Sequence, residues 1–357
     1  MNAAVFPLHE LPPEHAAGWA AAQAAAARAA TPRFRGPCFH PEFFRRVGRH
    51  YPAARVAVVT AAGRTGYLPH TLDARGRFAQ PVPLCDYDAL VSDASEPWDV
   101  AALLRALGVA AWHPAHLCGL ADLAGTGREL ATEAALRVEL HGGAEAYFAK
   151  LNAAGRSLRH LTAARRRLER DLGPLRFELD SPDAELLTTL LRWKAERFDG
   201  GTPPVPWIPA LLREWHAERG GRVRPLLSVL WAGQHLIAAH FGVHAQGVLH
   251  YWFPAFAPEH GRYSPGAQLI EQLIRELHQV ECEVLDLGPG GERYKRYFAN
   301  GSMPVTRAYL ERTSIHTTPR RWRRMLMRSV RRRSWWARGV RPLARAVRRA
   351  SRRGDQR

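Results

Sequence analysis

Two short stretches of this sequence carry residue types at spacings that could do chemistry, and the first is Tyr263–Ile270. Ser264 predicts a helix N-cap, and Pro265 suits the first helical position, where its missing N–H costs nothing. Gly266 lets a ligand approach the backbone closely. A helix start with free N–H groups and the positive end of the helix dipole binds anions such as phosphates. The same pattern also fits an ordinary helix start without a ligand.

The second stretch runs from Asp286 to Lys295. Asp286 ends an apolar strand expected over 284–287 and precedes a Gly-Pro-Gly-Gly loop. Side chains at the C-terminal edge of a strand often carry function in α/β folds. This carboxylate either accepts a proton or caps N–H groups of the loop, and both interpretations stay open. Glu292 is the alternative base, or a first-turn carboxylate of the short helix that also holds Tyr294.

The order of predicted elements in the second half places both stretches after strands of one sheet. The sequence predicts a strand, two helices, a three-stranded antiparallel meander, a helix, a strand, a helix and a strand: 175–179, 184–198, 210–219, 224–231, 236–243, 248–253, 264–279, 284–287, 292–298 and 305–311. The first half mixes strands and helices in the same way. The whole chain is therefore expected to be of α/β type.

A long helical stretch over 144–172 joins the two halves. Apolar residues keep helical spacing along it, and Gly155 predicts a bend. The opposite face, over 156–170, is very basic. It is either a solvated helix face or a surface for an anionic ligand, such as nucleotide phosphates or an acidic partner.

The basicity of the chain is concentrated at its end. The net charge is +18 over 357 residues, but residues 319–357 hold 16 Arg and one acid, which leaves about +3 for the rest. Trp322, Leu326, Trp336 and Val340 follow one helical stripe of this tail. A basic amphipathic segment with Trp on its apolar face favours an anionic membrane surface. The alternative is a disordered tail that binds any polyanion, RNA included.

Other sequence features exclude several classes of protein. The four cysteines lie far apart, so neither a disulfide framework nor a structural zinc site is expected. His235, His240 and His250 lie on predicted strands without a Glu at ligand spacing, so no metal site is expected. No signal peptide and no apolar run of membrane-spanning length is visible. The expected location is cytoplasmic, with the tail able to hold the protein at the inner face of the membrane.

Several motifs, taken in order, resemble one family. They are Trp193-Lys194, Tyr251-Trp252, Phe256-Ala257-Pro258-Glu259, Tyr263-Ser264-Pro265-Gly266, Asp286-Leu287-Gly288 and Gly291-Glu292-x-Tyr294-Lys295. Together they resemble the CelD/FemAB-like GNAT acyltransferases of tandem-GNAT type, over roughly 144–298. The family often has an aromatic-Asp-Pro where this chain has Phe256-Ala257-Pro258, so a carboxylate is missing there.

The resemblance implies a tandem acyl-CoA N-acyltransferase (GNAT) fold, with mixed, mostly antiparallel sheets flanked by helices. Residues 1–143 would be a degenerate GNAT-like domain, residues 144–318 the acyltransferase domain, and residues 319–357 the basic tail. The implied reaction moves an acyl group from acetyl-CoA or another acyl-CoA to an amine or hydroxyl. The implied acceptor is a cell-envelope or exopolysaccharide precursor, and no metal takes part.

The resemblance also implies roles for individual residues. The N–H groups around Gly266, Ala267 and Gln268, behind Ser264, would bind the donor's pyrophosphate, and Arg262 would add a charged contact. Asp286 would accept the amine proton, with Glu292 as the alternative. Tyr294 and Lys295 would protonate the leaving thiolate or contact phosphate; a core Tyr and a solvated Lys are the alternatives.

Two rival functions remain. The first is an aminoacyl-tRNA-dependent ligase of the Fem type, with the basic face of 156–170 as the tRNA contact. The second is a non-catalytic GNAT-like module that binds nucleic acid or another polyanion through its tail.

Overall fold

The computed structural model describes residues 1–29, 32–94, 96–125, 127–156, 158–197 and 207–312. The basic tail and most of the proline-rich loop around 200–209 lie outside the described residues. The predictions made for them therefore stay predictions.

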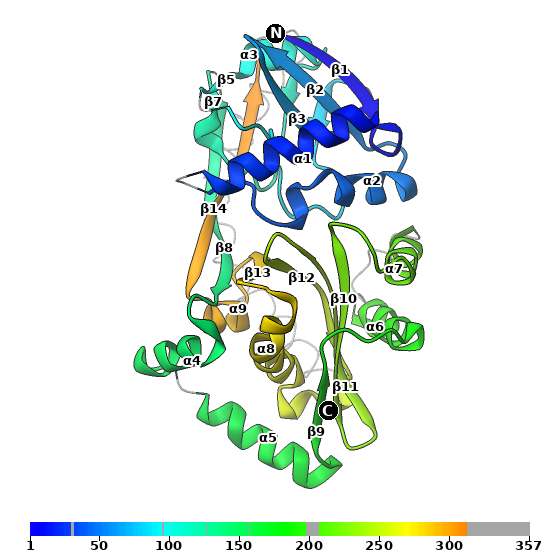
Figure 1. Ribbon diagram of the computed structural model, residues 1–357, viewed down its shortest axis with the longest axis vertical. Helices are drawn as coiled ribbons and strands as arrows, with labels where there is room; N and C mark the ends of the chain where they lie inside the picture. The colour runs from blue at the N-terminus through cyan, green and yellow to red at the C-terminus, as the bar shows by residue number, and fades with distance from the viewer. Residues whose placement is uncertain (30–31, 95, 126, 157, 198–206, 313–357) are drawn as a thin grey trace, which may run out of the picture.

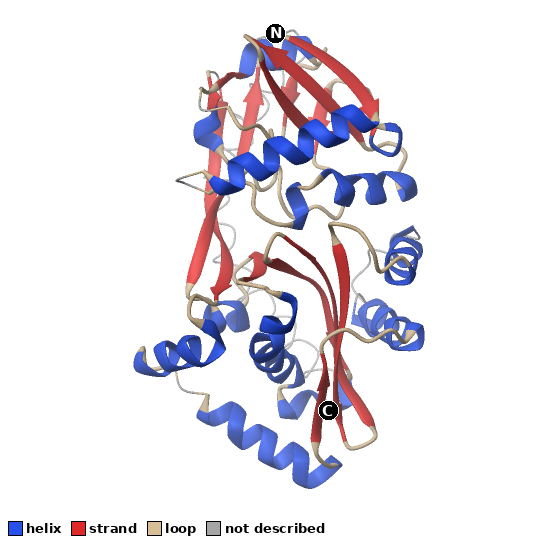
Figure 2. Ribbon diagram, viewed as in Figure 1, coloured by secondary structure: helices blue, strands red, loops and turns tan. Residues whose placement is uncertain are grey.

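A single twelve-stranded sheet runs through the molecule in the order β1-β2-β3-β4-β6-β14-β8-β13-β12-β11-β10-β9 (Figures 1 and 2). The strands of the first half are β1 (Asn2–Pro7), β2 (Arg55–Ala61), β3 (Arg64–Leu72), β4 (Phe78–Gln80) and β6 (Ala111–Trp112). Those of the second half are β9 (Leu175–Glu178), β10 (Arg224–Ala232), β11 (His235–Ala245), β12 (Val248–Phe256) and β13 (Val284–Pro289). A separate two-stranded sheet pairs β5 (Trp98–Asp99) with β7 (Leu123–Ala124).

Two long strands join the halves. β8 (Gly127–Glu139) pairs with β13 on one side and with β14 (Gly301–Glu311) on the other, and β14 also pairs with β6. Figure 1 shows β8 and β14 along one side of the molecule, from the N-terminal part to the second half. The last strand of the described residues thus returns to the first half.

Helices cover both faces of the second half's strands. The helices are α4 (Gly143–Ala153), α5 (Arg159–Leu172), α6 (Ala184–Arg197), α7 (Trp207–Ala217), α8 (Pro265–Glu276) and α9 (Arg293–Phe298). Figure 1 shows α8 on one side of β10–β12, with α6 and α7 on the other. Leu273 and Ile274 of α8 pack with Leu249 and Leu285 in one buried core. The helix predicted over 144–172 is broken near Gly155, whose φ of 73° is left-handed.

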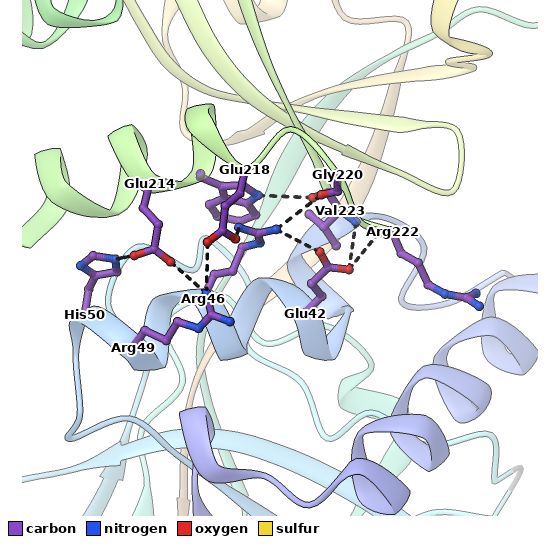
Figure 3. Close-up of polar contacts among 10 residues, drawn as sticks. Glu42, Arg46, Arg49, His50, Glu214, Glu218, Gly220, Arg222 and Val223 are labelled. Atoms are coloured by element: carbon purple, nitrogen blue, oxygen red, sulfur yellow. Dashed lines mark hydrogen bonds and ion pairs between the residues drawn. The ribbon is translucent and has the colours of Figure 1, made fainter. Parts of the chain in front are cut away.

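The first half docks on α7 through α2 (Pro41–His50), and its other helices are α1 (Pro13–Arg28) and α3 (Val100–Ala106). Arg46 donates to Glu218 at 2.8 Å and Arg49 to Glu214 at 2.9 Å (Figure 3). His50 Nε2 lies 2.6 Å from the second carboxylate oxygen of Glu214. These ion pairs join helices from different halves that lie about 170 residues apart in sequence.

The strands β12 and β13 pair in parallel only at their beginnings. The paired residues are Val248 with Val284, Leu249 with Leu285, and His250 with Asp286. Beyond His250, β12 continues to Phe256 and pairs with β11 alone. The gap that opens between the two strands leaves the outer backbone edge of β12 without a strand partner.

A bulge lies at the point where the strands part. Val243 pairs with His250 and Phe241 with Phe253, so two residues of β12, Tyr251 and Trp252, face the single Gly242 of β11. A bulge leaves the extra residue out of the ladder and bends the strand. The bend directs β12 away from β13.

Candidate active site

A pocket of about 350 Å³ follows the open edge of β12. Its walls include Tyr251, Pro254 and Phe256 of β12, Ser264 and Gly266 at the start of α8, and Tyr294 of α9. Of the residues predicted to act, Ser264, Gly266, Ala267 and Tyr294 line this pocket. The predicted order of elements placed the two stretches after strands of one sheet, and the structure brings parts of both to one pocket.

Ser264 occupies the predicted N-cap position of α8, and Pro265 begins the helix, but the side chain does not make the cap. Ser264 has φ 56° and ψ 48°, in the left-handed region, and its side chain makes no capping hydrogen bond. A capping hydroxyl requires extended backbone at this position, so the expected side-chain cap is wrong. The Ser264 carbonyl instead accepts the N–H groups of Ala267 and Gln268, each at 3.1 Å. Among the described residues, the Gly266 N–H has no such acceptor.

Gln268 and Arg262 hold the turn together. The Gln268 side chain is fully buried, donates to the Tyr263 carbonyl at 3.0 Å and accepts from Arg165 at 3.3 Å. Arg262 donates to the Tyr263 hydroxyl, which donates to Asp171. Arg262 is not part of the pocket wall, and its contact with a phosphate stays a prediction.

The Glu292–Lys295 segment contributes one side chain, Tyr294, to the wall of the pocket. Burial, and then the charge of Glu292, raise the pKa of Tyr294 to about 12. Tyr294 therefore keeps its proton at neutral pH. Lys295 is buried and donates to the Pro289 carbonyl at 2.8 Å, with Glu292 at 3.2 Å. Lys295 is thus not the solvated neighbour that one interpretation of the sequence expected.

Asp286 lies behind the loop that it was expected to cap. Its Oδ1 accepts from the Gly288 N–H at 2.9 Å and from the Tyr87 hydroxyl at 2.6 Å. Arg137 of β8 approaches Oδ2 at 3.5 Å. The hydrogen bond from Gly288 is the expected capping interaction, and the Asp286 side chain is buried. Proton transfer by Asp286 stays a prediction.

A further pair, His250 and Asp86, was not predicted from the sequence. His250 Nε2 lies 2.9 Å from Asp86 Oδ2, across 164 residues of sequence. Burial acts to lower the pKa of His250, but the hydrogen bond and charge of Asp86 outweigh it and raise that pKa. Burial likewise acts to raise the pKa of Asp86, and His250 reverses the direction, so this pKa is lowered. No local pattern could have paired two residues from different halves.

Neither a metal centre nor a membrane span is found in the described part of the chain. No group of three or more His, Cys, Asp or Glu side chains there could hold a metal ion. No described helix is long and apolar enough to cross a bilayer.

Comparison with known proteins agrees with this architecture. Residues 155–296 match the family model described as an acetyltransferase (GNAT) domain. The C-terminal domain of a candidate lysylphosphatidylglycerol synthetase from Agrobacterium fabrum has a similar structure. Its TM-score is 0.50 at 13% sequence identity, over 83% of this chain and 93% of that chain. No curated protein sequence matches this chain.

Two further crystal structures are also similar. FemX has 11% identity and a TM-score of 0.44, over 72% of this chain and 87% of its own. A tandem GNAT protein from the clavulanic acid biosynthesis pathway has 13% identity and a TM-score of 0.46, over 86% of this chain and 98% of its own. Residues 155–296 thus match a GNAT acetyltransferase domain, and the chain as a whole has a mixed α/β fold similar to that of the Agrobacterium fabrum domain.

Proposed function

We propose that this protein transfers an acyl group from acetyl-CoA or another acyl-CoA to an amine or hydroxyl acceptor. The observation that carries the proposal is the pocket along the unpaired edge of β12, which ends at the start of α8. An amide-bearing arm can hydrogen-bond to such an edge as an added strand. A phosphate at the far end would meet the Gly266 N–H and the positive end of the helix dipole.

The residues around the pocket support roles in the chemistry. Acyl transfer needs a donor for the developing oxyanion and an acid for the leaving thiolate. Tyr294 lines the pocket and keeps its proton, so we assign it to the leaving thiolate. The bulge at Tyr251 and Trp252 turns backbone out of the ladder beside the pocket, where an N–H could face the oxyanion. Lys295 would support Tyr294 by holding the loop at Pro289. Glu292 is proposed as the alternative to Asp286 as the base.

The acceptor is proposed on the family resemblance alone to be an amine or hydroxyl of a cell-envelope or exopolysaccharide precursor. The tail over 319–357 is proposed to bring the protein to an anionic membrane surface, because about +15 of the chain's net charge of +18 lies there.

A second candidate is a donor on aminoacyl-tRNA, and the groove between α4, α5 and α8 favours it. This groove has a volume of about 990 Å³ and includes Arg159, Arg166 and Arg167 of α5 in its wall. Arginines along a groove suit a phosphate backbone. The groove lies beside Glu271 and Arg275, further along α8 than the pocket.

The donor assignment can be tested with two substitutions at one position. Gly266 has an ordinary φ, and an added Cβ would lie 3.6 Å from Phe256 Cδ1, so side chains fit there. We expect Gly266→Glu to weaken acetyl-CoA binding at least tenfold, because it puts a negative charge where the pyrophosphate binds. Gly266→Ala is the matched control and should bind nearly as the parent does.

The measurement is the thermal shift of the purified chain against acetyl-CoA and longer acyl-CoAs. Stabilisation grows with ligand concentration relative to the dissociation constant, so modest binders also show. Equal acetyl-CoA binding by Gly266→Glu and Gly266→Ala would show that the pyrophosphate does not bind at this helix start.

A further inference from the structure

His250 and Asp86 lie at the point where the central strands separate. His250 and Asp286 form the last parallel pair between β12 and β13. The next residue, Tyr251, lines the pocket along the open edge of β12. Asp86 is therefore hydrogen-bonded to the residue that directly precedes a wall residue of the pocket.

The Asp86 carboxylate has one oxygen held and one oxygen open. Its Oδ2 is hydrogen-bonded to His250, whose side chain is only 1% exposed. The Asp86 side chain itself is 42% exposed. No hydrogen bond or ion pair within the described part of the chain reaches Asp86 Oδ1. One carboxylate oxygen is thus held by His250, and the other is free to accept a hydrogen bond from a ligand.

The surroundings keep this carboxylate in place and leave space beside it. His116 Nδ1 lies 3.0 Å from the Asp86 backbone carbonyl. A Cβ on Gly288 would lie 3.3 Å from Asp86 Oδ2, so the glycine at this loop avoids crowding the carboxylate. The other His250 nitrogen, Nδ1, has no hydrogen bond to a described residue, and Asp286 Oδ2 is 4.0 Å away. These contacts are those of an oriented group rather than a surface charge.

We propose that Asp86, from the first half, binds the acceptor as an ammonium ion, so that the acceptor is a primary amine rather than an alcohol. This inference rests on the proposed acyl transfer. A fixed carboxylate with an open oxygen accepts charge-assisted hydrogen bonds from an ammonium group, which are stronger than those from a hydroxyl. The two substrates would approach the gap between β12 and β13 from opposite faces of the sheet. His250 is a positioning residue that acts through Asp86.

The proton balance is consistent with this role. The ammonium loses one proton to Asp86, which passes it to solvent, and the free amine attacks the thioester carbonyl carbon. A C–N bond forms and the C–S bond breaks. The leaving thiolate takes one proton from Tyr294, and the second amine proton passes back to the Tyr294 phenolate, so the products are an amide, a free thiol and the one proton released through Asp86.

The test uses the full chain labelled in its histidine rings and follows the His250 resonance by NMR. The cation probe is n-butylammonium chloride, and n-butanol is a neutral probe of the same length. We expect the cation alone to shift the His250 resonance, and we expect Asp86→Asn to weaken that response at least tenfold. His250→Gln assigns the resonance; if that variant does not fold, the resonance most changed by Asp86→Asn assigns it.

Glu133→Gln is the matched control, because it removes the same charge from a carboxylate of similar exposure, 44%. Glu133 pairs with His116 and not with His250. It should keep the full response. The inference is overturned if n-butanol acts as strongly as the cation, if Glu133→Gln matches Asp86→Asn, or if the cation leaves His250 unchanged. Acetyl-CoA thermal shifts on the same samples separate the two proposals. If the cation shifts the His250 resonance but acetyl-CoA does not bind, only the proposed acyl-CoA donor is rejected. If acetyl-CoA binds but the cation leaves the His250 resonance unchanged, only the proposed role of Asp86 is rejected.

Discussion

The pKa values of two buried histidines on neighbouring strands, His240 and His250, shift in opposite directions because of their surroundings. Asp86 raises the pKa of His250, as an opposite charge at hydrogen-bond distance should. His240 is fully buried and stacks on Tyr251 with 4.3 Å between ring centroids. Neither of its ring nitrogens has a hydrogen-bond partner among the described residues. Burial, and then the charges of His250 and Lys194, lower the pKa of His240 to about 3. His240 therefore stays neutral where His250 favours its charged form.

His240 should make the protein sensitive to acid. Its folded pKa of about 3 is below the unfolded value of 6.5, so the unfolded state binds more protons between those values. Stability is then full above about pH 6.5 and falls as the pH decreases toward 3. At pH 5 this one group costs about 2 kcal/mol, from roughly 1.4 kcal/mol per pH unit. We expect His240→Phe, which keeps a ring against Tyr251, to remove that part of the loss.

The measurement is urea unfolding at pH 7 and pH 5. The variant should retain part of the acid loss, because burial also lowers the pKa values of His40 and His244 to about 4. His235→Phe, at the exposed start of β11, is the control and should follow the parent. An identical loss in His240→Phe and in the parent would contradict the assignment.

At the scale of elements, the site depends on where β12 stops pairing with β13. The meander and the helix after it follow from apolar periodicity and turn residues, and the structure contains both. The shortness of the β12–β13 ladder does not follow from either pattern, because the bulge at Tyr251 and Trp252 exists only against Gly242 of β11. The helix α8 and the separated strands together make the pocket.

The contact between α2 and α7 is expected to depend on Arg46 more than on Arg49. The Arg46 side chain is only 9% exposed, pairs with Glu42 and lies over the Trp215 ring at 5.3 Å. Its pair with Glu218 counts little, since Glu218 is half exposed. Arg46→Ala leaves Glu42 without its cation and loses packing, so we expect it to lower the free energy of unfolding by about 2 kcal/mol.

The matched control is Arg49→Ala, because Arg49 is 44% exposed and its pair with Glu214 lies at the surface. Its expected cost is below about 1 kcal/mol. Urea unfolding of the two variants measures the difference. A larger cost for Arg49→Ala would mean that exposed pairs, and not the buried guanidinium, hold the two halves together.

At the scale of the whole molecule, the first half contributes to the second half's site. Tyr87 donates to Asp286, and Asp86 holds His250, while β8 and β14 continue one sheet through both halves. The predicted division at 143/144 separates the halves in sequence, yet β8, which precedes it, pairs with β13. Whether the halves act as separate domains stays a prediction.

Removing residues 319–357 tests the proposed role of the tail. The deletion changes the net charge from +18 to about +3. We expect binding to vesicles with anionic phosphatidylglycerol to fall at least tenfold at low salt, because each Arg near such a surface contributes about 1 kcal/mol. Acetyl-CoA stabilisation should be unchanged, and phosphatidylcholine vesicles are the control. Undiminished vesicle binding would place the membrane contact elsewhere, and loss of every activity would favour the polyanion-binding module.

The sequence by itself determined the local elements: the meander, the helix from Pro265, the loop after Asp286 and the family motifs within 144–298. These depend on periodicity and turn chemistry over a few residues. Tertiary structure decided the left-handed conformation of Ser264, the early end of the β12–β13 ladder and the pairing of Asp86 with His250. The physical reason is that burial, register and charge partners depend on residues more than a hundred positions away, which no local pattern specifies.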